Sequence, residues 1–362
     1  MNRRQFVTAT GMMAGASVVP ASRGQSIQRS SRGLQDTPNN GKAVSIPVGT
    51  STAFTTFTPV VLPVPQRPVD LELKVSAPAS GRSLPIVLLS HGHGNSNYLS
   101  SLNGYAPLAN FYASHGFVTI QPTHLDSKAL GLPQNGPEGP LFSRSRVQDM
   151  KQIMDKLDVI ESTVLGLQGR LDHKRIAVIG HSAGGQTAAM LMGLRLTDPD
   201  NGEVSNLIDS RIKAGVLLSA PGNGGADLSP SALKFFRSYL KPDFSSMVTP
   251  TLVVYGDQDV DVEHHLTVRG PDWHADPYVL SGGPKCLLTL YGAKHNLGGI
   301  SGFDAAEATD ENPQRVAAVQ RLTWAYLRSA LYRGDSSWAN ARSAFAGMND
   351  IGEIECKGEQ SS

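Results

Sequence analysis

The order of apolar and polar residues divides the chain into segments typical of strands and segments typical of helices. In residues 69–76 apolar and polar side chains alternate, the period-two pattern of a strand with one buried face. Residues 85–90 are continuously apolar instead, as expected of a strand covered on both faces. Later segments predict further strands: residues 116–122, 175–179, 212–219, 251–256 and, as the last strand, 285–291.

Helices are expected between these strands, at residues 105–115, directly after residue 184 and at 313–331. Seven apolar residues between positions 147 and 164 also fall at helical spacing on one face. We interpret this stripe as core packing rather than a cofactor site. Residues 125–143 hold several Gly and Pro without any period, which predicts a long loop of the kind that is usually functional.

Strands that alternate with helices pair in parallel, so the pattern predicts an α/β fold with a doubly wound, mostly parallel sheet and helices on both faces. Residues 43–65 contain prolines at 47, 59, 63 and 65, which restrict that segment to a sheet edge. We expect one catalytic domain over residues 43–345, followed by a polar C-terminal tail at 346–362.

The N-terminus has the pattern of an export signal. Arg3 and Arg4 precede a short run of small and apolar residues that reaches Val19 and is followed by Pro20-Ala21-Ser22, similar to a twin-arginine signal. We therefore predict an export signal at residues 1–24, a polar linker at 25–42 and a periplasmic or secreted protein. The apolar run is shorter than the roughly 20 residues of a transmembrane helix, so no such segment is expected.

Composition narrows the classes of partner. The 362 residues are 40% hydrophobic and 17% charged, with 32 Lys and Arg against 31 Asp and Glu. Without a basic stripe, nucleic acid is not expected as a partner. Cys286 and Cys356 lack the spacing of a metal or redox site, and whether they form a disulfide stays open.

The strongest chemical signal is the pentapeptide Gly180-His181-Ser182-Ala183-Gly184, between a predicted strand and a predicted helix. A G-x-S-x-G turn of this kind exposes its serine at the end of the strand, near the helix N-terminus. Since a serine hydroxyl is a weak nucleophile, it needs a histidine base and a third group that orients the base. Asp257, Asp259 and Asp261 follow the strand at 251–256, and His295 follows the strand at 285–291.

Together these segments resemble the α/β-hydrolase superfamily. The residues that match are Ser90-His91-Gly92-His93-Gly94, the pentapeptide, Gly256-Asp257-Gln258-Asp259 and Gly292-Ala293-Lys294-His295. Within the superfamily the chain is most similar to dienelactone-hydrolase-like, platelet-activating-factor-acetylhydrolase-like and chlorophyllase-like esterases.

The resemblance implies a catalytic triad of Ser182, Asp259 and His295, with no cofactor. It also implies an oxyanion hole formed by the backbone N–H groups of His93 and Ala183. Trp273 and Tyr278, between the acid and the last predicted strand, are candidates for the substrate pocket, with surface packing as the alternative. His91 and His93 have no third metal ligand at a defined spacing, so no metal is expected.

We therefore predict a serine hydrolase that cleaves carboxylic esters through an acyl-enzyme, with a small-molecule or lipid ester as substrate. A lactone hydrolase and an acyltransferase would use the same triad and remain alternatives. A non-catalytic binding protein would normally have lost a triad residue, which favours an enzyme.

Overall fold

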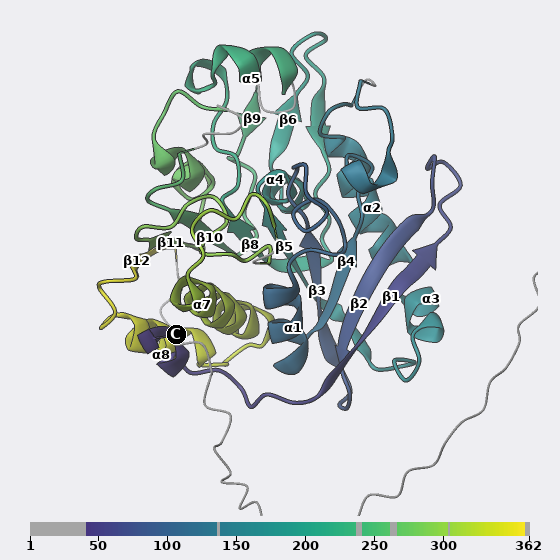
Figure 1. Ribbon diagram of the computed structural model, residues 1–362, viewed down its shortest axis with the longest axis vertical. Coiled ribbons are helices and arrows are strands. Elements are labelled where there is room, and N and C mark those ends of the chain that lie inside the picture. The colour runs from purple at the N-terminus through teal and green to yellow at the C-terminus, as the bar shows by residue number, and fades with distance from the viewer. Residues whose placement is uncertain (1–40, 136–137, 237–240, 261–265, 303–304, 359–362) are drawn as a thin grey trace, which may run out of the picture. The chain divides into compact units, whose positions relative to one another are not determined.

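The computed structural model describes residues 41–135, 138–236, 241–260, 266–302 and 305–358. The predicted export signal, and the predicted linker up to residue 40, lie outside these ranges. Most of the described residues belong to strands and helices, and most of the strands form one large sheet (Figure 1).

Among the described residues, nine strands form this sheet in the order β1-β2-β4-β3-β5-β8-β10-β11-β12. Their bounds, in chain order, are β1 Phe54–Leu62, β2 Leu71–Pro78, β3 Leu84–Ser90, β4 Val118–Pro122, β5 Leu171–His181, β8 Ile212–Leu218, β10 Thr251–Gly256, β11 Lys285–Leu290 and β12 Gly352–Lys357. The pairs from β4 to β11 are parallel, and the antiparallel pairs lie at the two ends of the sheet. The predicted mostly parallel α/β sheet is confirmed.

Helices cover both faces of the sheet, as the pattern predicted. They are α1 Ala106–Ser114, α2 Ser143–Asp155, α3 Leu157–Thr163, α4 Ala183–Leu191, α5 Pro230–Phe235, α6 Asp276–Val279, α7 Pro313–Leu331 and α8 Ser337–Phe345, with short 3₁₀ turns η1 Gly41–Ser45, η2 Lys128–Leu130, η3 Gly225–Asp227 and η5 Pro271–Ala275. In β3, Ile86 and Leu88 join the core beneath α2, α3 and α4, whereas Val87 and Leu89 join the core beneath α1, α7 and α8. This alternation explains why the strand is apolar throughout. Figure 1 shows α1 and α7 side by side on one face.

The C-terminal segment corrects one expectation. Residues 352–357 form the edge strand β12, antiparallel to β11, so this part of the predicted tail belongs to the sheet and β11 is not the last strand. Cys286 and Cys356 face each other in this pair and form a disulfide. Prediction failed here because an edge strand alternates charged and apolar residues, and Glu353 and Glu355 gave the segment the composition of a tail.

Three smaller features complete the fold. The expected helix over residues 147–164 is divided at Lys156 into α2 and α3, while its apolar stripe is buried as predicted. Strands β6 Arg195–Thr197, β7 Val204–Asn206 and β9 Pro242–Asp243 form a separate small sheet. No helix among the described residues has both the length and the apolar character needed to cross a membrane.

Candidate active site

Ser182 occupies a sharp turn between β5 and α4. Its backbone has φ 54° and ψ −122°, a conformation that is strained for a residue with a Cβ. A Cβ on Gly180 would lie 1.9 Å from the carbonyl oxygen of Gly184, and a Cβ on Gly184 would lie 2.1 Å from that of Ser90. Only glycine at both positions allows β3, β5 and α4 to meet this closely. The predicted strand, turn and helix are present.

His295 and Asp259 form a pair at the ends of neighbouring strands β11 and β10. His295 Nδ1 donates to both carboxylate oxygens of Asp259, at 3.0 and 3.1 Å. Asp259 is 2% exposed. Burial alone would raise the pKa of this carboxyl, but the adjacent His274 and His295 hold it well below its usual value, so Asp259 is a carboxylate. Of the two other candidate acids, Asp257 accepts the Gly292 N–H, and Asp261 lies outside the described residues.

One cavity of about 400 Å³ connects the predicted residues. Ser182, Ala183, His93 and His295 all line it, together with His274. Apolar side chains make up much of the remaining wall, namely Leu99, Leu141, Phe236, Val260 and Leu266. Residues that lie up to 202 positions apart in the chain, the difference between 295 and 93, therefore line the same cavity.

The loop after β3, which carries the backbone N–H of His93, is held by buried polar groups. Arg146, on α2, donates to the carbonyl oxygens of His91 (2.7 Å) and Gly92 (3.3 Å) and to Asp126 (2.5 Å). The His93 ring donates to the same Asp126 carboxylate at 2.9 Å. Asp126 is fully buried; burial would raise its pKa, but the Arg146 charge and the His93 hydrogen bond lower it. These contacts fix the direction of the His93 backbone.

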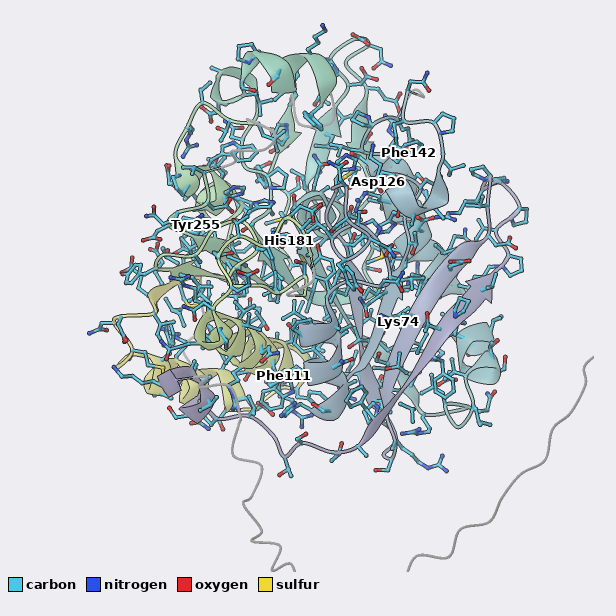
Figure 2. All side chains as sticks on the ribbon, viewed as in Figure 1. Lys74, Phe111, Asp126, Phe142, His181 and Tyr255 are labelled. Atoms are coloured by element: carbon cyan, nitrogen blue, oxygen red, sulfur yellow. A yellow bond between two sulfur atoms is a disulfide. The ribbon has the colours of Figure 1, made fainter. Side chains whose placement is uncertain are left out.

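His181, the second residue of the pentapeptide, connects this loop to the loop that carries His295. Tyr105 Oη accepts the Gly92 N–H at 2.9 Å and lies 2.8 Å from His181 Nδ1, while His181 Nε2 donates to the His295 carbonyl oxygen at 2.8 Å. Since Nε2 faces a carbonyl, it carries the proton, and Nδ1 accepts from the Tyr105 hydroxyl. Figure 2 labels His181 near the middle of the view and Asp126 above it. The loop after β3, the turn at Ser182 and the loop that carries His295 are thus joined by hydrogen bonds.

Neither predicted pocket residue lines the cavity. Trp273 is buried and its indole N–H donates to the Asn223 carbonyl oxygen, whereas Tyr278 packs in the core with Lys357 over its ring. The neighbouring His274 lines the cavity in their place, and its Nε2 lies 3.3 Å from Asp259 Oδ2. Sequence reasoning left His274 without a role, because only the turn of η5 decides which of two adjacent rings faces the site.

Sequence reasoning also missed Arg146, Asp126 and Tyr105. Asp126 lies in the loop at 125–143 that was expected to be functional, and Arg146 directly precedes the apolar stripe of α2. The position of Arg146 next to a stripe of buried residues could have indicated a buried charge, but the sequence does not show which groups this charge contacts.

Two groups of three side chains in the described part of the chain have ligand atoms within 4.8 Å of one another. In the first group, Asp259, His274 and His295 use these atoms in contacts with each other. Asp158, Glu161 and His173 lie away from the cavity, and two of the three are exposed.

Comparison with known proteins agrees with this geometry. The sequence profile of the alpha/beta hydrolase family matches residues 86–345, which include every residue of the site described above. The chain is also 28% identical over 183 residues to chlorophyllase-2 of Arabidopsis thaliana, a match that covers 51% of this chain. The chain spans about half the length of this curated relative, 49%.

Proposed function

We propose that this chain, which belongs to the alpha/beta hydrolase family, is a serine hydrolase that cleaves carboxylic esters. The observation that carries the proposal is the shared cavity, in which Ser182 at a strained turn and His295 paired to Asp259 line one space. Similarity to a chlorophyllase, an ester hydrolase, favours an ester over other acyl substrates.

In the first half of the proposed reaction, His295 takes the proton of the Ser182 hydroxyl while the oxygen bonds to the ester carbonyl carbon. Asp259 holds the His295 ring by its Nδ1–H, which leaves Nε2 as the base. The resulting oxyanion accepts hydrogen bonds from the backbone N–H groups of Ala183 and His93. Ala183 is the first residue of α4, where backbone N–H groups have no acceptor within the helix.

The proton on His295 then passes to the leaving alcohol oxygen, and the carbon–oxygen bond of the ester breaks. Water attacks the acyl-enzyme with His295 again as base, which releases the carboxylic acid and restores the Ser182 hydroxyl. The apolar wall of Leu141, Phe236 and Leu266 beside the serine suits a substrate with an apolar acyl or alcohol part.

The test compares hydrolysis of p-nitrophenyl acyl esters of increasing chain length by the wild type and Ser182→Ala. We expect the variant to lose at least about a thousandfold in kcat, because the nucleophile and base act as a unit. Ser162→Ala on the surface of α3 is the matched control and keeps full activity. Equal rates for Ser182→Ala and wild type would exclude the mechanism. As a second test, the wild type is treated with an organophosphonate, which reacts with a nucleophilic serine, and mass spectrometry should locate the modification on Ser182.

We further propose that the protein is exported, since the twin-arginine pattern and the disulfide between Cys286 and Cys356 both fit an oxidising compartment. Replacing Arg3 and Arg4 together by lysine should retain the protein in the cytoplasm. Unchanged export of that variant would contradict the proposal.

A further inference from the structure

His274 is the second histidine on the Asp259 carboxylate. Its Nε2 lies 3.3 Å from Oδ2, and the rings of His274 and His295 have centroids 5.7 Å apart. The residue is 2% exposed and lines the cavity that contains Ser182. Asp259 therefore lies between two imidazoles, one of which has no part in the triad.

The contacts of His274 determine where its protons are. Nδ1 lies 2.7 Å from the carbonyl oxygen of Ala220, which can only accept a hydrogen bond, so Nδ1 carries a proton. Nε2 lies 3.3 Å from Oδ2 of Asp259, which is ionised, in a direction that departs from that of a hydrogen bond. A neutral ring would leave the carboxylate beside an unprotonated nitrogen, whereas a second proton on the ring places opposite charges 3.3 Å apart.

The fold holds His274 in this position from several sides. Ser219, at the end of β8, has φ 43°, and this strained turn leads into the Ala220 carbonyl that accepts from Nδ1. Two residues after His274 along the chain, the Asp276 carboxylate accepts the Asn223 N–H at 2.8 Å and pairs with Arg269 at 2.9 Å, which holds this segment in place. Since backbone strain is retained where the surroundings demand it, the orientation of His274 is a fixed feature of the site.

We propose that His274 is a permanently protonated positioning residue that holds the Asp259 carboxylate beside His295 and offsets its charge. The catalytic consequence rests on the proposed ester hydrolysis; the charge of His274 does not. His274 keeps both protons throughout the reaction, so the proton exchanged with Ser182 resides on His295 alone.

Two other titratable groups described near His274 leave this sign unchanged. From β5 it faces His181, which is neutral because Tyr105 and the His295 carbonyl use both of its ring nitrogens. On its own segment, the Asp276 carboxylate is paired with Arg269. Among the described residues, Asp259 is thus an anion in contact with the His274 ring, and the positive ring offsets its charge.

His274→Gln removes the charge and keeps an amide that can donate to Ala220 or Asp259. We expect the acid limb of the kcat/KM profile to move to higher pH by roughly one unit, while the plateau kcat falls less than about tenfold. His173→Gln, an exchange of the same type at a half-exposed surface histidine, should leave the profile unchanged. A purely structural role would lower the plateau without moving the acid limb.

The second measurement needs no substrate. In protein labelled with ¹⁵N-histidine, the difference between the spectra of wild type and His274→Gln assigns the His274 ring signals. We expect both ring nitrogens of the wild type to be protonated from pH 5 to 8. If one of them lacks a proton at pH 7.5, the inference is wrong whatever the kinetics show. Loss of the ester activity itself in the Ser182→Ala comparison tests the proposed function separately, because the charge of His274 is read without catalysis.

Discussion

At the scale of single residues, the site depends on buried charges that hold backbone as well as on the groups proposed to touch substrate. Arg146 is 1% exposed, and its guanidinium contacts two carbonyl oxygens of the loop after β3 as well as Asp126. The fork of an arginine can make these bonds together, whereas the point charge of a lysine cannot. The position of the His93 N–H thus depends on a residue 53 positions away, the difference between 146 and 93.

Arg146→Lys tests this dependence. We expect kcat to fall by about ten- to a hundredfold with little change in KM, since misplacing one oxyanion donor removes up to a few kcal/mol of transition-state stabilisation. We also expect the free energy of unfolding to fall by about 1–3 kcal/mol, because carbonyl oxygens lose buried donors. Steady-state kinetics and urea unfolding measure the two effects. Arg211→Lys, at a partly exposed ion pair, is the control. A kcat equal to wild type in Arg146→Lys would show that the loop keeps its conformation without the Arg146 contacts.

At the scale of elements, the strands buried on both faces could be predicted because their sequences are apolar throughout. The placement of the three candidate triad residues at one edge of the sheet could be predicted because each of them follows a strand end. The edge strand β12 could not, since one of its faces is exposed and carries Glu353 and Glu355. The division between α2 and α3 at Lys156 could not be predicted either, because the helical spacing of apolar residues continues across it. The choice of His274 over Trp273 depends on the phase of the η5 turn, which no periodic pattern sets.

The disulfide makes β12 a testable element. It closes a loop of 70 residues between neighbouring strands, so the chain-entropy estimate for its contribution is about 4 kcal/mol. We expect Cys356→Ser to lower the free energy of unfolding by roughly 2–4 kcal/mol while kcat changes less than twofold, because neither sulfur lines the cavity. Urea unfolding with and without reductant checks this result. Wild type in reductant should match the variant, and an unfolding curve that reductant leaves unchanged would contradict it.

At the scale of the whole molecule, the site is built from loops at the ends of β3, β5, β8, β10 and β11, all joined through buried histidines. Burial and the charge of Arg146 hold the pKa of His91 and of His124 well below the usual value. Burial lowers the pKa of His181 to about 3. The unfolded chain protonates these residues near pH 6.5, whereas the folded protein leaves them neutral. Folding is therefore disfavoured as the pH falls below that value.

Two groups act in the opposite direction between pH 7.5 and 5.5. A protonated His274 already holds its proton in the folded state, and burial raises the pKa of Asp149 to about 6, so that this carboxyl gains a proton on folding. Over this interval, each of the three neutral histidines lowers the free energy of unfolding by roughly 1.4 kcal/mol, and the two opposing groups together raise it by about half of that sum. We expect the free energy of unfolding to fall by about 2 kcal/mol from pH 7.5 to pH 5.5.

Urea unfolding at the two pH values measures this loss, and two variants assign it. His181→Gln removes one neutral histidine, so its loss should be smaller than that of wild type by about 1 kcal/mol. His274→Gln removes an opposing group, so its loss should be larger by a similar amount. His173→Gln, with its side chain 39% exposed, should behave as wild type. A loss that is the same in His181→Gln and His274→Gln would mean that at least one of the two rings does not have the charge assigned to it, because the two substitutions should move the proton balance of folding in opposite directions.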